Sequence, residues 1–77
     1  MDLLERVVRA IQDCDLFKCK RKGNIVEVLV CGMKMFNIYE NGFIATNEKS
    51  SNNQFYKLFD IVSKERADMF LDFSLNN

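Results

Sequence analysis

The chain has no histidine, proline or tryptophan, and only three glycines and three cysteines among its 77 residues. Without histidine, metal sites and catalytic triads that need an imidazole are excluded. The sequence also contains no glycine-rich phosphate loop and no calcium-binding loop. We therefore expect a protein without catalytic activity, and we expect no cofactor and no bound metal.

Neither sign of charge is in excess, because eleven basic residues balance eleven acidic ones. A strongly basic composition would have indicated a nucleic-acid partner. There is no uninterrupted run of 18 apolar residues, so we expect no membrane contact. The first residues lack the basic and apolar regions of a signal peptide. These features predict a cytoplasmic protein.

The cysteines Cys14, Cys19 and Cys31 are odd in number, and their spacings match no zinc-binding pattern. In a reducing compartment we expect all three to remain free thiols that pack as small apolar side chains.

Residues 1–77 have room for a single domain, which we expect to begin with a helix. Apolar side chains recur at helical spacing from Leu3 to Ile11. Asp2 stands where an N-cap belongs, and Glu5 follows three residues later as a reciprocal capping partner.

A change to two-residue periodicity after this helix predicts a hairpin. Runs at 16–22 and 25–31 flank Gly23-Asn24, a two-residue turn that places Lys22 opposite Ile25. One face of this hairpin is expected in the core; it carries Phe17, Cys19, Val26, Val28 and Val30.

A second hairpin is predicted from runs at 35–40 and 43–46 around Asn41-Gly42. In a two-residue turn Tyr39 would oppose Ile44, so the expected core face holds Phe36, Ile38, Phe43 and Ala45. Gly32 leaves two alternatives open. Either it turns the chain and gives four strands, or it marks a bulge in one long strand and gives three.

The polar segment 47–54 precedes a long second helix over 52–73, with Ser51 or Asn52 as its cap and a frayed tail over 74–77. An apolar stripe interrupted by Arg66 predicts that this helix buries Phe59. At about 33 Å it would outrun strands of about 20 Å. Either it bends near 63–66, or a partner covers its last turns.

The predicted fold is α+β: a helix, a three- or four-stranded antiparallel meander and a long C-terminal helix, with both helices on one sheet face. This order of elements is similar to that of the double-stranded-RNA-binding domain. That family's two contact motifs are absent, since Lys22-Gly23-Asn24-Ile25 replaces its Gly-Pro-x-His loop and 50–54 replaces its lysine cluster. The order is also similar to that of some small phage-encoded inhibitors, such as certain anti-CRISPR proteins.

The predicted outer face of the sheet combines three lysines of the first strand with apolar side chains. These lysines, Lys18, Lys20 and Lys22, are called the lysine row. The lysines either contact phosphates or protect a strand edge from mispairing. The apolar side chains are either scattered surface residues or a docking surface. The candidate partner-binding residues are Lys18, Lys20, Lys22, Ile25, Leu29, Met35, Tyr39, Ile44, Arg66 and Phe70.

Two functions fit this pattern. The first is a non-catalytic interaction module, an adaptor or an inhibitor encoded by a phage or mobile element, that binds a larger protein. The alternative is a nucleic-acid-binding domain that uses the lysine row and Tyr39. Because the net charge is near zero and the last helix overhangs, we also expect a homodimer.

Overall fold

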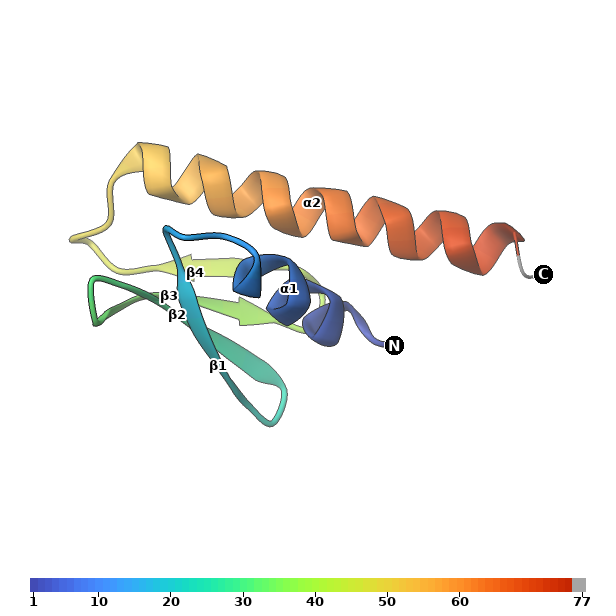
Figure 1. Ribbon diagram of the computed structural model, residues 1–77, viewed down its shortest axis with the longest axis horizontal. Helices are drawn as coiled ribbons and strands as arrows, with labels where there is room; N and C mark the ends of the chain where they lie inside the picture. The colour runs from blue at the N-terminus through green and yellow to red at the C-terminus, as the bar shows by residue number, and fades with distance from the viewer. Residues whose placement is uncertain (76–77) are drawn as a thin grey trace.

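Two helices and a four-stranded antiparallel sheet form the α+β fold of residues 1–75, which the computed structural model describes (Figure 1). The strands follow one another in the sheet in the order β1-β2-β3-β4. The elements are α1 (Leu3–Gln12), β1 (Lys18–Lys22), β2 (Ile25–Val30), β3 (Met33–Tyr39), β4 (Ile44–Thr46) and α2 (Asn52–Leu75).

The predicted cap of α1 is confirmed. Asp2 Oδ1 accepts a hydrogen bond from the backbone N–H of Glu5 at 2.8 Å. Arg21 of β1 also binds the Asp2 carboxylate, with Nη2 2.9 Å from Oδ2, so one side chain joins the helix start to the first strand. The buried face of α1 carries Leu3, Leu4, Val7 and Ile11.

The hairpin of β1 and β2 has the predicted register. Lys22 pairs with Ile25, Lys20 with Glu27 and Cys19 with Val28. The turn needs Gly23 at its first central position, because φ there is +59°. Val26, Val28 and Val30 point into the core as expected.

Of the two alternatives at Gly32, the structure has the turn and hence four strands. Cys31 and Gly32 both take positive φ, 52° and 80°, between the paired residues Val30 and Met33. This is the backbone of a two-residue turn with a left-handed residue at both central positions. A cysteine is an unusual occupant of such a position.

A bulge in β3 corrects the prediction for Met35, which was expected on the outer face. Val28 pairs with Phe36 but Leu29 pairs with Lys34, so Met35 is an extra residue in the strand. The bulge turns Phe36 toward the core, and Met35 is buried as well, at 8% exposure.

The connection to β4 also differs from the prediction. Gly42 N–H donates to Tyr39 O, and Tyr39 N–H donates to Phe43 O, both at 2.9 Å, so the loop has three residues rather than two. Gly42 takes φ +89° in this loop. The register shifts by one: Ile38 pairs with Ile44, which is buried, while Phe43 is 61% exposed. Ile44 was expected outside, and Phe43 and Ala45 were expected inside. All three expectations are wrong, because the shifted register places Ala45 beside Asn37 on the opposite face.

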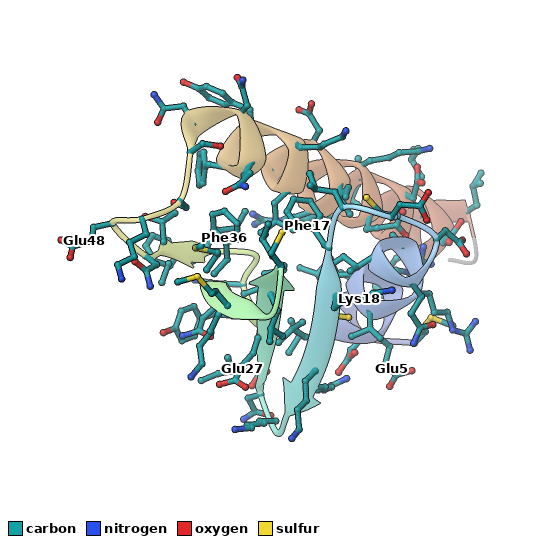
Figure 2. The ribbon with its side chains drawn as sticks, turned by 60° about the vertical axis from the view of Figure 1, so that its left-hand side comes forward. Glu5, Phe17, Lys18, Glu27, Phe36 and Glu48 are labelled. Atoms are coloured by element: carbon teal, nitrogen blue, oxygen red, sulfur yellow. The ribbon has the colours of Figure 1, made fainter. Side chains whose placement is uncertain are left out.

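Both helices cover one face of the sheet, and the core lies between the helices and that face. Phe17 and Phe36 meet there edge to face, with ring centroids 6.2 Å apart. They lie on the side of the sheet toward α2, whereas Glu27 lies on the other side (Figure 2). Leu58 and Val62 are the buried residues of α2.

The long helix α2 begins with the capping arrangement that Ser51 predicts. Gln54 N–H donates to Ser51 Oγ at 3.2 Å, and Ser51 N–H donates to Gln54 Oε1 at 3.1 Å. The helix continues unbroken to Leu75, so the predicted fraying at Ser74 is wrong; 76–77 lie outside the described residues.

No break interrupts α2 near 63–66, and its last turns project past α1 and the sheet (Figure 1). Its 24 residues span about 36 Å. An ion pair between Arg6 and Asp72 holds the projecting part to α1. The prediction that Phe59 is buried is wrong, because the side chain is 50% exposed.

Candidate interaction surfaces

Three cross-strand rows form the open sheet face, which is the side that neither helix covers. The first row is Lys22, Ile25 and Tyr39. The second is Lys20, Glu27, Asn37 and Ala45, and the third is Lys18, Leu29 and Lys34. The lysines are exposed, and Ile25, Leu29 and Tyr39 are half-buried, so six of the candidate residues share this face.

A single carboxylate organises the charges of the open sheet face. Glu27 Oε2 lies 2.8 Å from Lys34 Nζ, and its Oε1 lies 3.3 Å from Lys22 Nζ. These two lysines, Lys34 first, hold the pKa of Glu27 below its usual value. Lys18 and Lys20 have no carboxylate partner among residues 1–75. The face is therefore basic, but its positive charge is interrupted in the middle.

One end of the open sheet face carries an aromatic pair. The Phe43 and Tyr39 rings are 6.1 Å apart and tilted by 45°. Together with Ile25 they line a shallow hollow of about 610 Å³, and Glu40 and Asn41 complete its rim. Asn41 fixes the loop, since its Oδ1 accepts a hydrogen bond from Phe43 N–H at 3.0 Å.

The structure changes which residues this surface can use. Met35 and Ile44 are buried and cannot contact a partner without rearrangement. Phe43 replaces them. It was not among the candidate residues, because a two-residue turn at Asn41-Gly42 would place its side chain in the core. The available signal was the apolar run from Phe43 to Ala45, which is compatible with either register.

The second surface is the outer face of α2, which consists of Tyr56, Phe59, Ser63, Arg66, Phe70 and Phe73. Its aromatic side chains are exposed by 50% to 69%. Phe70 lines a hollow of about 930 Å³ beside Met1, at the projecting end of the helix. Arg66 folds over the loop before β4, where a Cβ on Gly42 would lie 3.6 Å from its Nη1.

The two surfaces are separate. The open sheet face and the outer face of α2 belong to different layers of the fold, with the core between the sheet and the helix. The candidate residue Phe70 therefore does not join the other candidates in one site, and Arg66 reaches only the loop before β4, where its side chain lies over Gly42.

The three cysteines are free thiols; Cys31 is exposed, and Cys14 and Cys19 are half-buried. Burial raises the pKa of the Cys19 thiol. Within 1–75, no three Cys, Asp or Glu side chains are grouped to hold a metal ion. No helix in that range is long and apolar enough to cross a membrane.

Comparison of the chain with protein-family models, with curated proteins and with solved structures finds no match. The two surfaces are therefore the features of the molecule that suggest a function.

Proposed function

We propose that this domain is a non-catalytic interaction module that binds a larger protein through the open sheet face. The observation that carries the proposal is Phe43, which is 61% exposed and lies beside Tyr39 over a hollow. Exposed aromatic clusters on small soluble domains mark binding surfaces, and aromatic residues dominate the binding energy of protein interfaces.

The charges of the open sheet face indicate which partner surface it would bind. Lys18 and Lys20 are exposed and lack a carboxylate partner among the described residues, so they would attract acidic side chains. A partner surface that places an apolar side chain in the hollow and carboxylates along β1 would complement this face. By covering such a surface the domain would act as an inhibitor or an adaptor.

A nucleic-acid partner is the second candidate, because lysines and aromatic rings also bind phosphates and bases. The positions of two carboxylates favour a protein instead. Glu27 pairs with Lys22 and Lys34 and so leaves only Lys18 and Lys20 free to bind phosphates. Glu40 lies on the rim of the hollow, where it would repel the phosphate of a stacked base.

In this proposal the module works in the reducing cytoplasm, where its three thiols stay free, and it works as a homodimer. Two copies would present two open sheet faces, and a partner with two matching surfaces would be bound more tightly through avidity.

Photo-crosslinking in the cells that make the protein tests the proposal without knowledge of the partner. A photoreactive phenylalanine analogue at Phe43 should yield one protein adduct. The same analogue at Met33, which is 46% exposed at the other end of the sheet, is the matched control and should yield none. Replacing Lys18 and Lys20 with glutamate should reduce the Phe43 adduct.

Oligonucleotide titrations test the second candidate. Fluorescence anisotropy with single- and double-stranded DNA and RNA should detect no micromolar complex at physiological salt. A complex whose affinity falls steeply with salt and is lost on replacing Lys18 and Lys20 would establish nucleic acid as the partner instead.

A further inference from the structure

The outer face of α2 has a spacing that reads the same in both directions. Its six residues, Tyr56, Phe59, Ser63, Arg66, Phe70 and Phe73, are separated by three, four, three, four and three positions. This is the three-four alternation by which helices pack side by side along a seam. Aromatic residues occupy both ends, and the small Ser63 lies near the centre.

We propose that two copies of the chain pair through this face with their α2 helices antiparallel. A two-fold axis passing between the levels of residues 64 and 65 would place Tyr56 opposite Phe73 of the other copy, and Phe59 opposite Phe70. Ser63 would face Arg66. The axis lies within about one residue of the midpoint of the helix, which runs from Asn52 to Leu75, so the two helices overlap along their whole length.

The exposed area is sufficient for such a pair. Tyr56, Phe59, Phe70 and Phe73 are 62%, 50%, 69% and 69% exposed. With roughly 200 Å² for each aromatic side chain, they offer about 500 Å² per copy and about 1,000 Å² in the dimer. Specific interfaces begin near this size. The pairing would also fill the hollow beside Phe70 with rings from the other copy.

The charges select the antiparallel arrangement. In a parallel pair the two Arg66 guanidinium groups would lie at the same level and repel each other. In the antiparallel pair each Arg66 faces a serine and lies within one turn of Asp60 of the other copy. Neither Arg66 nor Asp60 has an ion-pair partner in residues 1–75. In the single copy the Arg66 side chain lies over Gly42, and in the dimer it would turn toward Asp60 of the other copy. The helix dipoles also oppose each other favourably.

Sedimentation equilibrium tests the pairing, which specifies the surface of the proposed homodimer and does not depend on what the open sheet face binds. At high micromolar concentration we expect twice the monomer mass of 9.0 kDa. Phe59→Asp and Phe70→Asp should each weaken the dimer at least about 30-fold, the level of an interface hot spot. Phe43→Asp, an equally exposed aromatic position on the sheet, is the matched control and should leave the dimer unchanged.

Cysteine cross-linking tests the direction of the helices. Cys31→Asn removes the exposed native thiol, and asparagine tolerates the positive φ at this position. In that background, oxidising a mixture of Ser63→Cys and Arg66→Cys chains should join residue 63 to residue 66. A parallel pair would instead join each variant to itself.

Three results would overturn the inference. A mass of 9.0 kDa at every concentration would mean that no dimer forms, and the proposed homodimer would fail with it. A dimer that dissociates with Phe43→Asp but not with Phe59→Asp or Phe70→Asp would pair through the sheet. Cross-links of like residues only would establish a parallel pair. Circular dichroism confirms that each variant is folded.

Discussion

Replacing Phe17 with alanine would delete a ring at the centre of the core, where the side chain is 1% exposed and packs edge to face on Phe36. Truncation of a buried phenylalanine costs about 3–5 kcal/mol. The whole stability expected of 77 residues is about 4–12 kcal/mol. The unfolding midpoint should therefore fall by at least about 12 °C.

The same deletion at Phe43 provides the comparison. This side chain is 61% exposed, so folding buries only about two fifths of its surface. Phe43→Ala should therefore cost roughly 1–2 kcal/mol, about two fifths of the cost at a fully buried phenylalanine. Urea unfolding of both variants, followed by circular dichroism, gives the two free energies of unfolding. Because Phe17→Ala can fail to fold, Phe17→Leu and Phe43→Leu serve as a milder pair, and the loss at Phe17 should again be the larger one.

Equal losses at the two positions would refute the register of β4. A shift by one residue would bury Phe43 in the core and expose Ile44, which is the arrangement of a two-residue turn. In that case Phe43→Ala would cost as much as Phe17→Ala. The comparison therefore decides between the two hairpin loops.

The remaining predictions concern three local features. Cys31 should react with a thiol reagent before Cys19, because the Cys19 thiol is half-buried and its pKa is raised. Cys31→Asn should stabilise the domain by up to about 1 kcal/mol in thermal unfolding, because asparagine accepts φ 52° more readily than cysteine does. The hydrogen bonds from Arg21 and then from Glu5 N–H lower the pKa of Asp2 below its ordinary value of 3.8. The Asp2 carboxylate therefore contributes stability above pH 3.8, and this contribution is lost as the pH falls through the lower pKa of the folded state. Thermal unfolding between pH 2 and 6 should show that Asp2→Asn loses part of this acid dependence. Ser51→Ala should cost about 0.5–2 kcal/mol of unfolding free energy in urea by removing the cap of α2, and an unchanged value would mean that the start of this helix frays.

The elements predicted well are those in which local chemistry and burial agree. Gly23 fixed the first hairpin because its turn admits few backbone conformations, and the alternation of valines in β2 then allowed one register. The cap of α1 was equally local, since Asp2 and Glu5 lie within one turn of each other.

The second half of the sheet depended on features that short sequence patterns do not contain. Asn41-Gly42 serves a two-residue turn or the last two positions of a three-residue loop equally well, and only the packing of Ile44 against the core separates them. The bulge at Met35 arises because the Cys31-Gly32 turn would otherwise turn Phe36 away from the core.

Only part of the candidate surfaces was predicted, because part of them depends on the second hairpin. The lysine row and Tyr39 followed from the first hairpin, whereas Phe43 needed the correct loop. In α2 the aromatic residues recur at helical spacing on two neighbouring faces, and periodicity does not distinguish a face that meets the core from one that meets solvent. The overhang was predicted because it follows from length alone.

The sequential strand order has a consequence for synthesis on the ribosome. Each strand pairs with the next along the chain, so the meander can form as it emerges, but Leu58 and Val62 arrive only with α2. At roughly 5–20 residues per second, the 24 residues of α2 take about 1–5 s to make. A chain in which α2 has not yet packed covers the apolar side of the sheet with α1 alone, so it exposes apolar surface and is prone to aggregate.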